Sequence, residues 1–300
     1  MKSLKWLCAA ALAIAAIVSA AAQEQSSGTM SPPKVLSIVR EYVKPGKAGA
    51  MHDKTETAFV QAMTHSKMPT HYLGMNSITG KSRSLFFTGY DSFDAWEKDV
   101  VSQQKNAMLS ASLERASVAD GELLDSMDTA AFVYNEEYSL NQQAEHATPA
   151  TRYFEVSVYH VKHGHHKEWD EGVKMVLEGY KKALPEAHWA CYESMYGAPE
   201  GTYLFIVARK SAKELDSDFA HNKDFVAAMG EGGMKKLDEL SAASIESSEA
   251  NLFALNPNMS YVPAEWLKAD DFWKPKGGNS VAAGSKKPAE KPAEKTGAGQ

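Results

Sequence analysis

The sequence HYLGMNSITG at residues 71–80 is echoed by HWACYESMYG at residues 188–197, and this echo determines the expected fold. In both stretches a His precedes an aromatic residue, and a Ser and a Gly recur at the same places, 117 residues apart. KPGK at 44–47 is likewise echoed by KHGH at 162–165. A repeat of this length predicts two copies of one domain, because solenoid repeats are far shorter.

Each copy is expected to run β-α-β-β-α-β. In the first copy, the hydrophobic pattern predicts strands at 35–43, 71–79, 84–90 and 130–138, with helices over 47–68 and from 93 past 108. In the second copy, it predicts strands at 153–161, 187–196, 202–208 and 251–255, with helices over 166–184 and from 211, the latter broken at 230–233. This order is the ferredoxin-like unit, whose sheet carries helices on one face and must pack its other face elsewhere. We therefore predict an α+β fold of two tandem ferredoxin-like units that form a fused pseudo-dimeric α+β barrel.

The first residues predict an export signal. Lys2 and Lys5 precede an apolar run over residues 7–18, which is too short to span a bilayer, and small residues follow it. We expect a signal peptide at 1–22 and a periplasmic or secreted protein with no transmembrane segment after cleavage. An uncleaved anchor is the alternative.

The remaining chain is expected to divide into five segments. These are a disordered stretch (23–33), the first α+β unit (34–142), the second α+β unit (151–258), a C-terminal clamp with two Trp residues (259–275) and a disordered Lys/Pro/Ala/Glu tail (276–300). The formal net charge is −6, and the lysine-rich ends leave the body still more acidic, which argues against a nucleic-acid partner. Cys191 is the only thiol beyond the predicted signal peptide, so no internal disulfide is expected.

The first strand of each copy supplies candidate ligand contacts. Alternation places Arg40 and Tyr42 in the row that begins with Leu36, and we expect this row to face the helices. The second copy has Val158 and His160 at the corresponding places. Arg40 would neutralise an anionic ligand and Tyr42 would donate a hydrogen bond to it. A salt-bridged Arg at a surface strand end is the alternative.

Both copies also carry a His just before the second strand. His71 and His188 are candidates for a ligand contact or a catalytic base, and a structural His bonded to backbone is the alternative. Asn76 and Glu193 are further candidates that occupy equivalent positions. Because they differ in chemistry, the two sites would not be equivalent.

A cluster of imidazoles follows the first strand of the second copy. His160, His163 and His165 are weak candidates for a transition metal or an axial haem contact, and a solvated loop is the alternative. The first copy has Tyr, Pro and Lys at these places, so the repeat implies no ancestral metal site. We therefore expect no metal and no cofactor, with haem or a transition metal as the alternative.

From Val35 the sequence predicts a strand, a Lys-Pro-Gly-Lys turn and a helix. This order resembles NIPSNAP-like and antibiotic-biosynthesis-monooxygenase-like members of the dimeric α+β barrel superfamily. The resemblance covers residues 35–258 and implies that ligands lie between the sheet and the helices. We expect an exported small-molecule-binding protein, with a monomeric pseudo-dimer favoured although the oligomeric state is open. A cofactor-independent monooxygenase or a haem-handling enzyme is one alternative, and a non-catalytic envelope protein is another. The sequence does not decide whether the protein is an enzyme.

Overall fold

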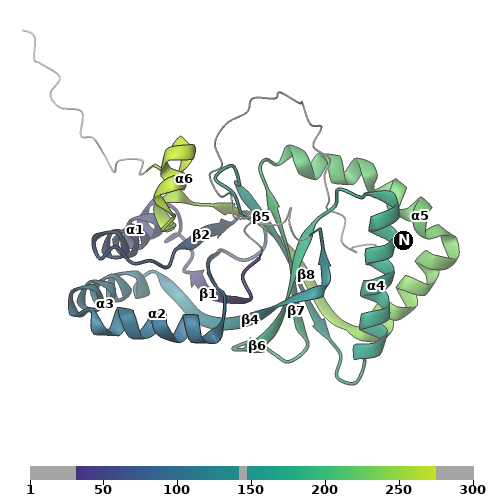
Figure 1. Cartoon of the computed structure of the whole chain (residues 1–300), viewed down its shortest axis with the longest axis horizontal. Coiled ribbons are helices and arrows are strands. Elements are labelled where there is room, and N and C mark those ends of the chain that lie inside the picture. Colours follow the sequence, from purple (N-terminus) through teal and green to yellow (C-terminus); the bar gives the residue numbers. More distant parts are fainter. Residues whose placement is uncertain (1–31, 142–146, 275–300) are drawn as a thin grey trace, which may run out of the picture.

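The computed structural model describes residues 32–141 and 147–274, and every structural statement below concerns these two ranges. The predicted signal peptide and C-terminal tail lie outside them. Eight strands close into a barrel in the order β1-β3-β2-β8-β5-β7-β6-β4, and neighbouring strands are antiparallel (Figure 1). The strands are β1 (Val35–Val43), β2 (Tyr72–Ser77), β3 (Arg83–Tyr90), β4 (Leu124–Leu140), β5 (Tyr153–Val161), β6 (Trp189–Tyr196), β7 (Thr202–Arg209) and β8 (Ile245–Leu255).

Helices cover the outside of the barrel on two opposite sides (Figure 1). On the first side lie α1 (Ala50–His65), α2 (Phe93–Lys105) and α3 (Ala107–Gly121), and on the second lie α4 (His166–Ala183) and α5 (Lys213–Ser244). A C-terminal segment adds two 3₁₀ turns, η1 (Pro257–Met259) and η2 (Asp271–Trp273), on either side of the short helix α6 (Ala264–Ala269). The mixed α+β barrel is therefore confirmed.

The two sides share one strand pattern. The first half of the chain contributes neighbours in the order β4-β1-β3-β2, the second contributes β8-β5-β7-β6, and the halves join through β2–β8 and β4–β6. The registers also correspond, since Glu41 lies opposite Ser84 in the first half and Tyr159 lies opposite Tyr203 in the second. This register defines which positions of the two halves are equivalent.

The barrel interior is one apolar core built from both halves. Leu36 and Ile38 of β1 pack there with Phe154 and Val156 of β5. The expected direction of this row of β1 is therefore wrong, because it faces the barrel interior and not the helices. A small closed barrel fills its interior with side chains from every strand, and in β1 the row that begins with Leu36 supplies them. The helices instead meet the row that carries Glu41.

The C-terminal segment contributes two rings to this interior core. Trp266 and Trp273 are buried in contact with each other, with ring centroids 5.1 Å apart. The indole Nε1 of Trp273 donates to the backbone oxygen of Pro149 at 2.7 Å, and Arg152 pairs with Asp270. The segment is thus fixed to the barrel by apolar and polar contacts.

Three element boundaries differ from the sequence-based expectation. The single helix predicted from residue 93 breaks at Asn106, whose side chain accepts from the backbone N–H of Leu109 at 3.1 Å and so starts α3. Strands β4 and β8 begin at Leu124 and Ile245, before the predicted apolar runs, because their exposed polar residues still pair with β1 and β5. The predicted break at Gly230 is present, with a φ of 66° inside α5.

None of the described helices has the length and apolarity that a membrane span requires.

Candidate functional site

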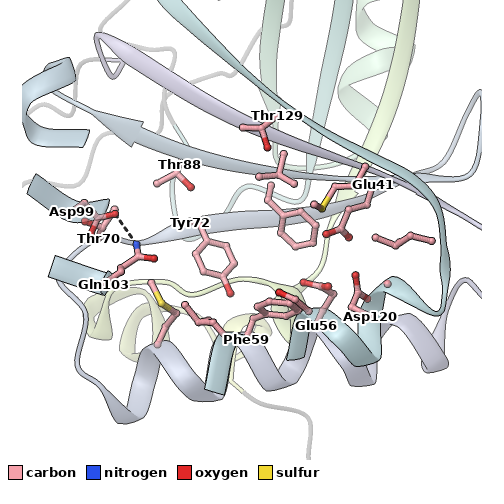
Figure 2. A pocket seen from close by; sticks show the side chains of 18 of the residues that line it. Glu41, Glu56, Phe59, Thr70, Tyr72, Thr88, Asp99, Gln103, Asp120 and Thr129 are labelled. Atoms are coloured by element: carbon pink, nitrogen blue, oxygen red, sulfur yellow. Dashed lines mark hydrogen bonds between the residues drawn. The ribbon is translucent and has the colours of Figure 1, made fainter. Parts of the chain in front are cut away.

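A cavity of about 410 Å³ lies between the outer face of the first-half sheet and helices α1 and α3 (Figure 2). Its volume is that of a small-molecule site. Most of its wall is apolar, and the apolar side chains come from both the sheet and the helices. They include Val39, Phe59, Met63, Phe86 and Leu113.

One end of this cavity holds four buried polar side chains, which we call the carboxylate–imidazole cluster: Glu41, His52, Glu56 and Asp120. One potential ligand atom from each lies within 4.8 Å of the others, and no other such group of His, Cys, Asp and Glu occurs in the described ranges. The Nε2 atom of His52 lies 3.1 Å from Glu41 Oε2, 3.3 Å from Asp120 Oδ1 and 3.8 Å from Glu56 Oε1.

Three elements bring the cluster together. Glu41 projects from β1, and His52 and Glu56 lie one turn apart on α1, which places both on the same helix face. Asp120 stands in the last turn of α3 and accepts a hydrogen bond of 2.7 Å from the hydroxyl of Thr55. The cluster therefore depends on the docking of both helices against the sheet.

The orientation of the His52 ring is set from its far side. Its Nδ1 atom lies 3.5 Å from the Ser84 hydroxyl oxygen, and that hydroxyl donates to Asn76 Oδ1 at 2.6 Å. Because Ser84 uses its proton on Asn76, its oxygen is left to accept from Nδ1–H. On the opposite side of the ring, Nε2 faces the three carboxyl groups and is hydrogen-bonded to Glu41 Oε2.

Burial makes two of these carboxyl groups weak acids. Burial, followed by the nearby Glu41 and Asp120 charges, raises the pKa of Glu56 to about 10. Burial also raises the pKa of Glu41, against the lowering effect of its hydrogen bond with His52. At neutral pH the cluster therefore holds a neutral carboxylic acid at the cavity wall.

The rest of the cavity offers a second polar end and a central hydroxyl. Asp99 accepts from Tyr90 Oη at 3.1 Å and from Gln103 Nε2 at 3.0 Å at the end remote from the cluster (Figure 2). Between the two ends, Tyr72 points across the cavity with a buried hydroxyl that has no hydrogen-bond partner. Such a hydroxyl is free to donate to a bound molecule.

The corresponding space in the second half is filled. Tyr159 and Tyr203 are the register equivalents of Glu41 and Ser84, and both are buried against Trp169 of α4. The ring centroids of Trp169 and Tyr203 lie 5.1 Å apart, and those of Trp169 and Tyr159 lie 5.4 Å apart. The two halves therefore differ, with a mostly apolar cavity that ends in buried carboxyl groups in one and an aromatic core in the other.

Arg40 lies away from the cavity. Its guanidinium pairs with Asp128 of the adjacent strand β4 and donates to the backbone oxygen of Gly197 at 3.3 Å. The salt bridge agrees with the alternative interpretation of Arg40 as a paired residue at a strand end. The partner was expected to be a Glu on a helix, and it is instead an Asp on a neighbouring strand. Tyr42, two residues on, is half-buried in the same row of β1.

The other predicted site residues are dispersed. His71 stacks on Tyr261 with centroids 4.7 Å apart, and His188 places Nδ1 3.2 Å from the backbone oxygen of Glu186. Glu193 accepts a hydrogen bond of 3.2 Å from Tyr203 in the second half. Of all the predicted residues, only Asn76 touches the cluster, through Ser84. Ligand binding by the others stays a prediction.

The weak metal candidates do not converge. His160 Nδ1 lies 3.0 Å from the Thr202 hydroxyl, His163 is exposed and His165 Nδ1 lies 3.6 Å from Glu168 Oε1. The described residues that line the cavity also include no His, the axial ligand of globins and peroxidases, and no Lys or Arg to pair with the carboxylates of haem. This lining does not favour haem. The expectation of no cofactor is nevertheless unsupported, since the carboxylate–imidazole cluster is itself a set of potential metal ligands.

Sequence reasoning missed the cluster, although one signal was present. His52 and Glu56 form a His-x-x-x-Glu pair on a predicted helix, and Glu41 is the only carboxylate on the first strand. The helix pair has no counterpart in the second copy, where Asp170 and Lys174 stand at these places. The role of Asp120 could not be predicted from its neighbours in sequence, because the direction of α3 depends on the helix break at Asn106.

No sequence-family model matches the chain, and no curated protein matches it in sequence. Solved structures are similar in fold. A candidate monooxygenase from Fusobacterium nucleatum has a TM-score of 0.50 at 12% identity, covering 75% of this chain and 94% of that one. A candidate monooxygenase from Lactobacillus acidophilus scores 0.46 at 10% identity over 77% of this chain and 96% of that one. A chlorite dismutase variant from Candidatus Nitrospira defluvii scores 0.45 at 10% identity over 80% and 97%. At 12% identity, the likeness to the Fusobacterium nucleatum structure shows a shared α+β barrel fold and no activity.

Proposed function

We propose that this protein is an enzyme that binds a small, largely apolar molecule in the first-half cavity and exchanges a proton with it. The observation that carries the proposal is the convergence of three buried carboxyl groups on a mostly apolar cavity of about 410 Å³. Burying such groups is costly for the fold, and groups of this kind gather where proton chemistry is performed.

The polar groups of the cavity define roles. Glu56, as a neutral acid, can donate a proton to a substrate oxygen, and Tyr72 can donate a hydrogen bond to it. Glu41 lines the same wall and can accept a proton from substrate carbon or hydroxyl once it is ionised. His52 lies behind the carboxyl groups with 1% of its side chain exposed, so it positions them and does not touch the substrate.

The charge of the cavity restricts the substrate. Several carboxyl groups and no Lys or Arg are among its described lining residues, so a neutral molecule is favoured over an anion. A carbonyl or phenol group on an aromatic or alicyclic frame would match both the apolar wall and the proton donors. Proton removal from such a molecule is also a first step toward its oxidation, the class of reaction named for the candidate monooxygenase with this fold.

We also propose that the two halves descend from one duplicated ferredoxin-like unit. Their common strand order and matching registers support this, and so do two equivalent backbone hydrogen bonds, Lys44 N–H to Leu123 O and Lys162 N–H to Ser244 O, at 2.9 and 2.7 Å. One copy would then keep an open polar cavity while aromatic residues fill the other. The basic and apolar start of the sequence supports export of this enzyme from the cytoplasm.

Leu113→Trp should block the cavity, because Leu113 of α3 lines it and an indole would occupy the space of the substrate. We expect a neutral aromatic ketone or phenol from a small panel to bind the wild type in isothermal titration, and Leu113→Trp to weaken that binding at least about tenfold. Val118→Trp is the matched control, since Val118 lies on the same helix, is 69% exposed and does not line the cavity.

Two results would contradict the proposed function. One is equal binding of the neutral compound by both tryptophan variants, which would place it elsewhere. The other is a preference of the wild type for benzoate-like anions over their neutral analogues. Glu41→Gln and Glu56→Gln should further lose turnover of any compound that the wild type converts, while both stay folded by circular dichroism.

A further inference from the structure

The geometry points to a binding site for one divalent first-row transition-metal ion in the carboxylate–imidazole cluster, with Glu41, His52, Glu56 and Asp120 as ligands. This inference deepens the proposed function, because it concerns the reacting end of the same cavity, but its test needs no substrate. It also differs from the sequence-based candidates, which lie in the second half and do not converge.

The spacing of the four side chains suits such an ion. Ligands bound about 2.0–2.2 Å from one ion lie roughly 3.4 Å from one another in a tetrahedral arrangement. The Nε2 atom of His52 already lies 3.1, 3.3 and 3.8 Å from one oxygen of each carboxyl group. No ligand atom lies more than 4.8 Å from another, so small rotations of the carboxyl groups would complete the site.

One buried oxygen of the cluster lacks the partner that an ion would supply. Glu56 Oε1 has no hydrogen-bond partner, and only 4% of the Glu56 side chain is exposed to solvent. This oxygen lies 3.8 Å from His52 Nε2. His52 Nε2 faces one oxygen of each carboxyl group but is hydrogen-bonded to Glu41 Oε2, at 3.1 Å. Carboxyl oxygens crowded together in a buried site repel one another when they are ionised, and a cation among them removes the repulsion.

The surroundings also resemble the outer shell of a metal site. A metal-bound His is usually oriented by a hydrogen bond from its other ring nitrogen, which is the contact that Nδ1 makes with Ser84. A bound carboxylate is usually held by a further donor, and the Thr55 hydroxyl donates to Asp120 Oδ1 at 2.7 Å. Two of the four proposed ligands are thus already held in place from behind.

The donor set indicates the kind of ion. One imidazole nitrogen with carboxylate oxygens suits Mn²⁺, Fe²⁺ or Zn²⁺, whereas Mg²⁺ and Ca²⁺ are usually bound by oxygen atoms alone. Two ionised carboxylates would neutralise the charge of a divalent ion. In the ion-bound form, the carboxylates hold the ion, and the ion would polarise a substrate oxygen in place of the Glu56 proton.

The second half provides an internal comparison. At a separation of 118 residues, the positions equivalent to Glu41, His52 and Glu56 hold Tyr159, Asp170 and Lys174. Lys174 pairs with Asp170 at 2.9 Å on the helix surface, and Tyr159 is packed among aromatic rings. The second half therefore cannot hold an ion in this way, and the inference predicts one ion per chain.

The test uses Mn²⁺ alone and the full-length protein, first stripped with a chelator. Titration followed by electron paramagnetic resonance of the free ion should show one Mn²⁺ bound per chain. Glu41→Gln and Asp120→Asn should each weaken this binding at least about tenfold, the lower end of the loss seen even for outer-shell changes at metal sites. Asp99→Asn is the matched control, because Asp99 is a buried carboxyl group at the other end of the same cavity, and it should leave Mn²⁺ affinity unchanged.

Three outcomes would overturn the metal site. They are no Mn²⁺ bound by the folded wild type, equal Mn²⁺ affinity in the wild type and Asp120→Asn, or an equal loss of affinity in Asp99→Asn. The neutral substitutions remove like charges from a buried cluster, so the variants should fold, and thermal unfolding in chelator checks this. A folded protein that binds the neutral ligand but no ion would overturn this inference alone. A protein that binds the ion but no neutral ligand would overturn the proposed function alone.

Discussion

Replacing Arg209 by Met should lower the free energy of unfolding by about 3–5 kcal/mol, the usual cost of removing one partner from a buried ion pair. The Arg209 side chain is 1% exposed, and its Nη2 atom lies 2.7 Å from Asp218 and 2.9 Å from Glu155. Burial raises the pKa of Asp218 to about 7 even against the attraction of Arg209. Without the guanidinium, the carboxyl groups of Asp218 and Glu155 would lose the cation that both contact.

The pH dependence identifies the cause of this loss. In the variant, Asp218 can avoid an isolated charge by keeping a proton that the unfolded chain releases near its ordinary pKa of 3.8. The unfolded state then binds fewer protons than the folded state, so the stability of the variant falls as pH rises. Urea unfolding at pH 5 and pH 8 should therefore show a larger deficit at pH 8.

Two controls separate the buried ion pair from a general effect of lost charge. Adding Asp218→Asn to Arg209→Met should recover part of the stability at pH 8, because it removes one of the stranded carboxylates. Lys98→Met breaks an exposed pair with Asp94 on α2 and should leave unfolding almost unchanged. An equal deficit at both pH values would instead attribute the loss to altered packing of the side-chain stem.

Much of the fold could be predicted because it rests on local patterns. The similarity between residues 71–80 and 188–197 predicts a repeated β-α-β-β-α-β unit, and Pro69 and Pro185 mark the ends of the first helix in each copy. The α+β barrel follows because such a unit has one uncovered apolar face. What local patterns could not decide is which face of β1 turns inward, since both rows begin with apolar residues.

The site could not be predicted in the same way. A cluster built from β1, α1 and α3 depends on where α3 begins, and that is fixed by the cap at Asn106 and not by hydrophobic periodicity. The divergence between the halves was equally hidden. Glu41 and Tyr159 are equivalent by register, yet Glu41 lies in the carboxylate–imidazole cluster and Tyr159 packs among aromatic rings. The proposed function therefore rests on residues that the two halves do not share.

Glu56→Gln should stabilise the ion-free protein increasingly as pH rises. Glu56 releases its proton near its ordinary pKa of 4.5 in the unfolded chain, but burial and the nearby carboxyl groups hold the folded-state pKa at about 10. Between these values, the folded state binds more protons than the unfolded state, so the contribution of Glu56 to stability becomes less favourable as pH rises. Gln imitates the neutral acid in shape and hydrogen bonding and does not titrate.

The expected result is a difference that grows with pH. At pH 4 the variant and the wild type should have nearly the same free energy of unfolding, and above pH 5 the variant should gain by up to about 1.4 kcal/mol per pH unit, the limit for one proton. Urea unfolding in chelator at pH 4, 6 and 8 measures this. Glu178→Gln is the control: Glu178 is exposed on α4 and Lys181 lowers its pKa, so its replacement should bring no gain at high pH. Parallel stability curves for Glu56→Gln and the wild type would show that Glu56 is ionised in the folded protein, and the acid at the cavity wall would then have to be Glu41.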